Sequence, residues 1–253
     1  MNAKKKQAAG ERRGFDTVKT LIEALLIALV IRTLLFQPFS IPSGSMEPTL
    51  LIGDYLFVSK FSYGFSRYSV PFAPPIFSGR IFASPPRRGD VVVFRHGDLD
   101  FIKRVIGLPG DQIQVRDAVV FINGTPVKRE RAADFIGRNP CRPTPPDSPP
   151  IRVARWHETL PNGVSFDTLQ CVTSGGFPDT TGVYTVPADH LFMMGDNREN
   201  SEDSRFPDVG YVPFDRLIGH AQILFFSLTD GGAWQIWRWP WDIRWRRLFH
   251  LIR

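Results

Sequence analysis

The sequence predicts a mostly β fold, namely an antiparallel, coiled β-sheet domain with an inserted small β subdomain, preceded by one N-terminal transmembrane helix. Three observations support this prediction. The 253 residues include 21 Gly, 22 Pro and 21 Phe, a composition that favours strands, turns and loops over a helical bundle. Short apolar runs bounded by turn residues fill most of the chain. One apolar run long enough to cross a bilayer, residues 18–36, comes before them.

The positive charge is concentrated at the two ends of the chain. The formal net charge is +6, but residues 1–13 and residues 233–253 each carry +4, which leaves −2 for the residues between them. A basic groove for nucleic acid is therefore not expected. Basic ends beside apolar segments instead predict contact with anionic membrane lipid.

The first predicted elements are a basic tail, residues 1–17, and a membrane anchor, residues 18–36. Glu23 and Arg32 lie toward opposite ends of the apolar run, where their side chains can reach the membrane surface. An amphipathic helix docked on a soluble core and a cleaved signal peptide are the alternatives, but no small-x-small site follows the run. Positive charge before the helix predicts a cytoplasmic N-terminus, with most of the chain outside the cytoplasm.

A stiff loop follows the anchor. Pro42, Gly44 and Pro48 disfavour continuation of the helix around Ser45. The hydroxyl of Ser45 is either ordinary loop polarity or a nucleophile close to the membrane. Eight residues separate it from Phe36, a span of less than about 30 Å even when fully extended.

The main β domain is predicted at residues 37–115 and 184–232. Alternation and short apolar runs predict its strands at 50–60, 90–95, 101–107, 112–115, 190–194 and 217–227. Residues 61–86 contain seven aromatic residues and five prolines without a regular period. They form either a docked surface loop or a loop that dips into the outer leaflet.

Residues 116–183 are predicted to be the inserted β subdomain. It contains a strand at 119–122, a hairpin signal at Asn123-Gly124, and a proline-rich segment, residues 139–150, that cannot form regular structure. Cys141 and Cys171 either pair in an exported domain or remain two free thiols. Neither cysteine lies in a CxxC motif and the five histidines are scattered, so neither a metal site nor a cofactor is expected.

The C-terminal segment, residues 233–253, holds five of the six tryptophans. A helix after Pro240 would place Trp241, Trp245, Leu248 and Ile252 on one face. Tryptophan and arginine on an amphipathic segment are typical of a membrane interface. The alternative is a C-terminal helix that caps the β domain.

The catalytic chemistry of Ser45 would require a base. The sequence has no GxSxG motif and shows no His–Asp partnership, so the alternative base is a lysine that burial keeps neutral. Lys103 lies in an apolar strand, where alternation places it and Arg104 on opposite faces. One of the two basic residues is expected to point inward, unless both lie at a strand edge. The pattern does not decide which one is buried.

Four segments together resemble the catalytic boxes of type I signal peptidases, which are membrane serine proteases with a Ser/Lys dyad. They occur in the family's order, after an N-terminal membrane segment, at residues 42–50, 88–94, 102–111 and 195–205. The resemblance covers about residues 15–227 and is weak in the insertion. Phe101 stands where the family commonly has tyrosine, and Glu202 lies within the last box. There is one apparent membrane segment where some members have two.

The resemblance implies that Ser45 is the nucleophile and that the neutral amine of Lys103 is its general base. Ser43 would line the oxyanion hole together with the backbone N–H of Ser45. The implied substrates are signal peptides of exported preproteins, cut after small-x-small sites. The implied location is the bacterial inner membrane, with a single span and an extracytoplasmic catalytic domain.

The resemblance also assigns supporting roles within residues 195–205. Ser201 would hydrogen-bond the lysine amine, Asp203 and Arg205 would form an ion pair, and Gly195 and Asp196 would shape a turn. Alternatives with the same chemistry are a specialised peptidase of one secretion or conjugation system and a self-cleaving repressor. A non-catalytic, membrane-anchored binding domain would leave the Ser45 and Lys103 pair unexplained.

Overall fold

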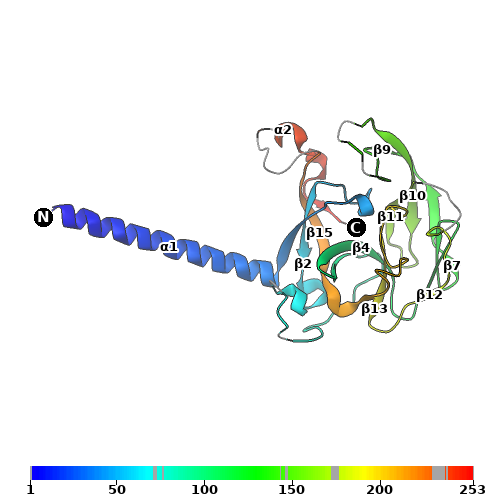
Figure 1. Cartoon of the computed structure of the whole chain (residues 1–253), viewed down its shortest axis with the longest axis horizontal. Helices are drawn as coiled ribbons and strands as arrows, with labels where there is room; N and C mark the ends of the chain where they lie inside the picture. Colours follow the sequence, from blue (N-terminus) through cyan, green and yellow to red (C-terminus); the bar gives the residue numbers. More distant parts are fainter. Residues whose placement is uncertain are drawn as a thin grey trace.

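The computed structural model describes residues 2–70, 73–75, 77–142, 144–145, 148–171, 177–229, 237 and 239–252, with side chains described from residue 16 onward. It consists of one long helix that projects from a β domain (Figure 1). The side chains of most of the predicted basic tail, together with Phe72, Trp234 and part of the proline-rich segment, lie outside the described residues.

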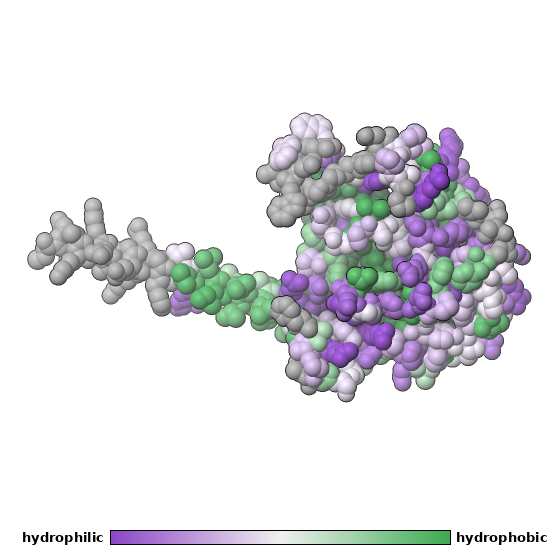
Figure 2. All heavy atoms as spheres, viewed as in Figure 1, coloured by the Kyte–Doolittle hydropathy of each residue, from purple (hydrophilic) through white to green (hydrophobic). Residues whose placement is uncertain are grey.

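The helix α1 runs from Asn2 to Leu34, so the apolar run forms its C-terminal half. Large apolar side chains are exposed along this half, which stands out against the mainly polar β domain (Figure 2). Among the residues that the structure describes, no helix combines the length and the apolar character needed to cross a membrane. The structure therefore confirms a helix at these residues but does not support the predicted membrane span.

The main sheet has eight strands among the described residues, and its neighbouring strands run antiparallel. The order is β1-β2-β15-β3-β4-β13-β14, and β16 also pairs with β15. Shifts of register along β15 mark irregularities that bend the sheet, as the predicted coiled sheet requires. The strands are β1 (Phe36–Ser40), β2 (Asp54–Ser59), β3 (Val91–His96), β4 (Leu99–Gly107), β13 (His190–Met194), β14 (Val212–Pro213), β15 (Leu217–Ser227) and β16 (His250–Leu251).

Two smaller four-stranded sheets lie beside the main sheet. One has the order β12-β5-β6-β7, and the other has the order β11-β10-β8, with β9 pairing with β10. Because β5 pairs with both β6 and β12, the predicted insertion limits at 116 and 183 fall inside a sheet. The strands are β5 (Gln112–Arg116), β6 (Val119–Ile122), β7 (Thr125–Pro126), β8 (Lys128–Arg131), β9 (Phe135–Gly137), β10 (Ile151–Thr159), β11 (Ser165–Gln170) and β12 (Tyr184–Thr185).

The proline-rich segment between β9 and β10 contains no strand among its described residues, as predicted. Cys141 in this segment and Cys171 just after β11 form a disulfide. The disulfide therefore joins the proline-rich segment covalently to the end of β11 within the inserted region.

The aromatic segment, residues 61–86, is partly docked and partly exposed. It includes two single-turn helices, η2 (Phe61–Tyr63) and η3 (Arg67–Ser69). Tyr63 is buried and its hydroxyl donates to Asp90, 2.8 Å away. Phe61 and Phe82 are exposed by 48% and 85%. Tyr63 therefore fits the docked loop, whereas insertion of the exposed aromatic side chains into a membrane stays a prediction.

The C-terminal segment does not form the predicted amphipathic helix. Its helical elements are short, namely α2 (Trp239–Asp242) and η6 (Trp245–Arg247). Ile243 forms an isolated bridge with Leu228, and β16 then hydrogen-bonds to β15. Ile252 is buried in the core, while Trp241 and Trp245 remain exposed. Strand pairing with the sheet therefore overrides the helical period of these residues.

Candidate active site

The loop around Ser45 is held rigidly from both sides. Residues 41–50, the Ser45 loop, form most of the connection from β1 to β2 and contain the single turn η1 (Gly44–Met46). Met46 and Leu50 are completely buried and pack in the core beneath the main sheet. Ser45 is only 7% exposed, whereas Ser43 is exposed. The apolar residues of the loop therefore fix the backbone from which the Ser45 hydroxyl projects.

Lys103 contacts Ser45 directly. Its Nζ lies 2.7 Å from Ser45 Oγ, and the lysine side chain is only 4% exposed. Burial lowers the pKa of Lys103 to about 8, against the opposing charges of Asp203, Glu202 and Asp196. The protonated form therefore still predominates near pH 7, but a minor fraction of this amine is neutral there and can accept a proton.

Arg104 is also buried, which corrects the expectation that only one of the two basic residues points inward. β4 lies between β3 and β13 and is covered on both faces, so its alternating side chains enter two different compartments. Arg104 forms a two-point ion pair with Asp196 and stacks over the ring of Phe166, 4.0 Å from its centroid. Asp196 also accepts a hydrogen bond from Thr49 Oγ1 at 2.5 Å.

The polar run, residues 195–205, packs against the back of the Ser45 loop. A Cβ added to Gly195 would lie 2.2 Å from Ser201 Oγ and 2.5 Å from the Ser45 carbonyl oxygen. Only glycine therefore fits here, which explains why the run can approach the loop so closely. Ser201 is buried in the same wall.

The predicted hydrogen bond from Ser201 to the lysine amine is not formed. Lys103 Nζ is directed at Ser45 Oγ instead, and the Ser201 hydroxyl interacts with Asp203, where a hydrogen bond from it lowers the pKa of that carboxyl. The predicted ion pair of Asp203 and Arg205 is present, with a separation of 2.8 Å. Burial alone would raise the pKa of Asp203, but the charge and hydrogen bonds of Arg205 lower it.

A cleft of about 720 Å³ opens over Ser45 and Lys103. Ser43 and Ser201 lie in its wall, and Asp100 and Glu202 add acidic groups. The apolar part of the lining comes from β1, the Ser45 loop, β3, β4 and the residue that follows the polar run, namely Phe39, Ile41, Val93, Leu99, Phe101, Ile102 and Phe206. An extended, mainly apolar peptide matches these walls, with Ser45 at the base.

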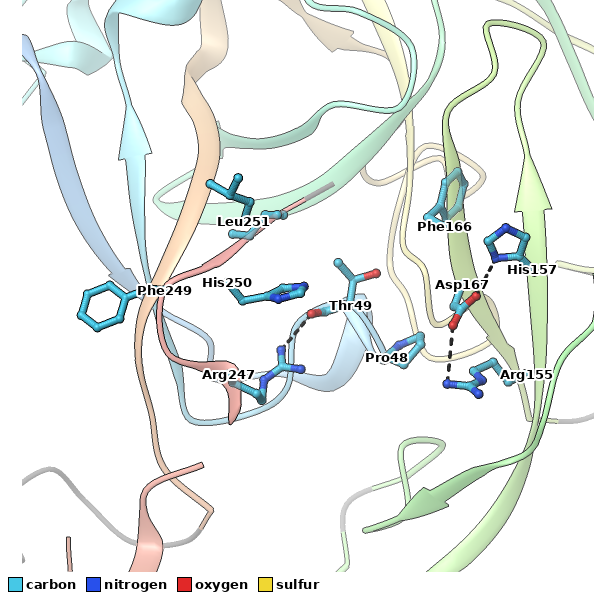
Figure 3. Close-up of a pocket in the computed structure, with 11 residues that line it drawn as sticks. Pro48, Thr49, Arg155, His157, Phe166, Asp167, Arg247, Phe249, His250 and Leu251 are labelled. Atoms are coloured by element: carbon cyan, nitrogen blue, oxygen red, sulfur yellow. Dashed lines mark hydrogen bonds and ion pairs between the residues drawn. The ribbon is translucent and has the colours of Figure 1, made fainter. Parts of the chain in front are cut away.

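A second cavity, of about 670 Å³, lies between the end of the Ser45 loop and the C-terminal segment (Figure 3). On one wall Arg247 donates to the Thr49 carbonyl at 2.9 Å. On the other wall Asp167 lies 2.9 Å from His157 Nδ1 and 3.5 Å from Arg155. The cleft over Ser45 is the better candidate for the active site, because its lining contains both Ser45 and Lys103 and the lining of this second cavity contains neither.

Sequence reasoning missed three residues that hold the site together, namely Thr49, Arg104 in its pairing role, and Asn197. The backbone N–H of Asn197 donates to the Ser45 carbonyl at 3.1 Å, and its Nδ2 donates to the Gly44 carbonyl at 3.0 Å. The density of polar residues in the run was the available signal. It did not indicate which side chain reaches which carbonyl.

Comparison with known proteins gives a consistent family match. The family model described as "Signal peptidase, peptidase S26" matches residues 14–226. The signal peptidase I of Rickettsia typhi (strain ATCC VR-144 / Wilmington) is 42% identical over 213 residues, which cover 80% of this chain and 76% of that protein. The signal peptidase I of Rickettsia akari (strain Hartford) is 43% identical over 213 residues, with the same coverage.

A crystal structure of a signal peptidase I from Enterococcus faecalis V583 is also similar. It is 22% identical in sequence, with a TM-score of 0.30, and the match covers 54% of this chain and 97% of that chain. A TM-score of this size does not by itself establish a shared arrangement of strands.

Proposed function

This chain belongs to the signal peptidase family, peptidase S26, and we propose that it cleaves its substrates with Ser45 as the nucleophile and Lys103 as the general base. The chain is thus a peptidase that removes signal peptides. The observation that carries the assignment of residues is the 2.7 Å contact between Lys103 Nζ and Ser45 Oγ in a buried site.

In the first step the neutral amine of Lys103 accepts the proton of the Ser45 hydroxyl as Oγ attacks the scissile carbonyl carbon. The carbonyl oxygen becomes an oxyanion, which the Ser45 N–H and the Ser43 hydroxyl stabilise; each such donor contributes about 3 kcal/mol in comparable hydrolases. The C–N bond then breaks, and the lysine ammonium gives its proton to the leaving amine. Water, activated by the same lysine, hydrolyses the acyl-enzyme and restores Ser45.

The substrate is a signal peptide bound in extended form along the edge of the cleft. Walls formed by Phe39, Ile41 and Phe101 favour apolar residues. Small side chains at the first and third positions before the cut, the Ala-x-Ala pattern, let the peptide backbone approach Ser45. The mature part of the preprotein leaves as the amine product.

The enzyme is anchored in the bacterial inner membrane through residues 18–36, with its N-terminus in the cytoplasm. The exposed apolar side chains along α1 support lipid contact. The backbone N–H of Lys60 donates to the Leu35 carbonyl, which ties the end of the helix to the β domain. The Cys141–Cys171 disulfide supports an extracytoplasmic location for the catalytic domain, because disulfides persist in oxidising compartments.

The experiment that tests this proposal is processing of a preprotein with an Ala-x-Ala site by the purified full-length chain in lipid vesicles. We expect a single cut after the second alanine, identified by sequencing the N-terminus of the product. A bulky residue in place of that alanine and the Ser45→Ala variant should each abolish the cut. Cleavage by folded Ser45→Ala at the wild-type rate would refute the assignment of the nucleophile.

A further inference from the structure

Asn197 lies between the nucleophile and the disulfide of the inserted region. It is completely buried, and its Nδ2 donates to two carbonyl oxygens, that of Gly44 at 3.0 Å and that of Pro140 at 2.7 Å. Its backbone N–H donates to the Ser45 carbonyl at 3.1 Å. Asn197 therefore connects the carbonyl groups of Gly44 and Ser45, which lie on either side of the Ser45 N–H, to Pro140, the residue before Cys141.

The disulfide holds Pro140, the residue at which the hydrogen bonds of Asn197 end on the side away from Ser45. Cys171 Sγ lies 3.5 Å from Asn197 Oδ1, and Cys171 is covalently joined to Cys141, next to Pro140. Asn200 Nδ2 makes a second hydrogen bond to the same Pro140 carbonyl at 2.6 Å. Two amides and one disulfide thus converge on Pro140, in a segment that has no strand among its described residues.

The polar run is fixed to the inserted region at this point as well. Leu169 of β11 forms a parallel bridge with Asn197, and its N–H donates to the Asp196 carbonyl at 2.9 Å. Arg198 forms a buried ion pair with Glu158 of β10, at 2.6 Å. The inserted region therefore supports the polar run, and the polar run supports the Ser45 loop.

We propose that Asn197 is a positioning residue for Ser45, and that the Cys141–Cys171 disulfide keeps it in position by holding the Pro140 carbonyl. This inference rests on the proposed role of Ser45 as nucleophile. Without the disulfide, Pro140 moves away and the Asn197 amide loses one of its two acceptors, so it no longer fixes the Gly44 carbonyl. A displacement of a reacting group by about 1 Å can lower the rate by about a hundredfold.

The expected kinetic effect is on kcat rather than on KM. The hydrogen bonds of Asn197 lead to the Ser45 loop and to Pro140, whereas the apolar cleft walls at Phe39 and Phe101 lie on β1 and β4. Loss of positioning therefore slows the attack of Ser45 but leaves the apolar contacts of the bound peptide in place.

The test is a cycle of four full-length proteins in lipid vesicles, namely wild type, Asn197→Ala, Cys141→Ser/Cys171→Ser and the triple variant, assayed on an Ala-x-Ala preprotein. We expect kcat to fall by about 10- to 100-fold in Asn197→Ala and by about 5- to 50-fold in the double cysteine variant, with KM within about twofold of wild type. The kcat of the triple variant should be no lower than that of Asn197→Ala, because the asparagine and cysteine substitutions disrupt the same connection between Pro140 and the Ser45 loop. Asn162→Ala is the matched control, since Asn162 Nδ2 donates to the Arg88 carbonyl away from the site.

Reduction of the wild-type protein by a phosphine provides a second measurement that needs no substitution. With loss of the disulfide checked by thiol titration and folding checked by circular dichroism, kcat should fall as in the double cysteine variant. An unchanged kcat in folded Asn197→Ala or in folded, reduced wild type would overturn the proposal. The proposal would also be overturned if the fold-decrease in kcat of the triple variant equalled the product of the fold-decreases of Asn197→Ala and of the double cysteine variant. A Ser45→Ala variant that still cleaves would instead refute the proposed nucleophile.

Discussion

Arg104 and Asp196 form a two-point ion pair that is closed off from solvent. Arg104 Nε lies 2.8 Å from one carboxylate oxygen of Asp196 and Nη2 lies 2.7 Å from the other. Both residues are at most 1% exposed. Arg104 follows Lys103 on β4, so its ion pair with Asp196 holds the strand that carries Lys103. Asp196 also accepts a hydrogen bond from Thr49, so the same carboxylate holds the end of the Ser45 loop.

We expect Asp196→Asn to destabilise the fold strongly, since it removes the negative charge that Asp196 places against the buried Arg104 guanidinium. The free energy of unfolding, measured by urea denaturation, should fall by about 3–5 kcal/mol. Asp167→Asn is the matched control. Asp167 pairs with His157 and Arg155 at partly exposed positions, so its loss should cost no more than about 1 kcal/mol. Equal losses in the two variants would contradict the structural role of the buried pair.

Gly195→Ala should inactivate the enzyme. The new methyl group would lie 2.5 Å from the Ser45 carbonyl oxygen, so the Ser45 loop and the polar run must separate. We expect kcat to fall by about a hundredfold or more in the preprotein assay. Gly182→Ala is the control, because no atom lies within 4 Å of the position of its added carbon. Retention of wild-type kcat in Gly195→Ala would show that the loop does not need this close contact.

The pH dependence of kcat/KM should reflect the titration of Lys103. Burial lowers the pKa of the Lys103 amine to about 8, and only the neutral amine accepts a proton from Ser45. Activity should therefore rise with pH, reach half its maximum near pH 8 and level off above it. Glu202 stabilises the charged form, so Glu202→Gln should move this midpoint to lower pH. A midpoint that stays fixed or moves upward in Glu202→Gln would argue against Lys103 as the titrating group.

The C-terminal segment should separate into structural and membrane-contacting residues. Ile252→Ala should lower the free energy of unfolding by about 2–5 kcal/mol, because Ile252 packs in the core. Trp241→Ala and Trp245→Ala should leave stability unchanged, since both indoles are exposed. In vesicles with brominated lipid, each tryptophan substitution should reduce the quenching of tryptophan fluorescence. Undiminished quenching in both variants would place these indoles away from the membrane.

The strands, and the two residues that the structure brings into contact at Ser45 and Lys103, were predictable because their signals lie in short segments of the sequence. Alternation and apolar runs identified β3, β4, β13 and β15 to within about two residues, and the four motifs located Ser45 and Lys103. The burial of Arg104 was not predictable from alternation. That pattern assumes one exposed face, whereas β4 has a neighbour on each side and is covered on both faces.

Two other features depend on partners that are distant in sequence. The period of residues 241–252 fits a helix, but hydrogen bonds from β15 convert the end of the segment into β16. In the sequence Asn197 is one polar residue among many, and only the folded chain places the Gly44 and Pro140 carbonyl groups next to its side-chain amide. The residue pattern around β16 or around Asn197 does not indicate either contact.

The most direct test of the central claim is the kcat of Lys103→Met on an Ala-x-Ala preprotein, with Lys60→Met as the matched control. Lys60 is also buried, and burial likewise lowers its pKa to about 8, but its Nζ donates to the Ser69 carbonyl at 2.5 Å rather than to Ser45. We expect kcat to fall by about 10²- to 10⁴-fold in folded Lys103→Met. Folded Lys60→Met should stay within about threefold of wild type. Wild-type kcat in folded Lys103→Met would contradict the assignment of Lys103 as the base.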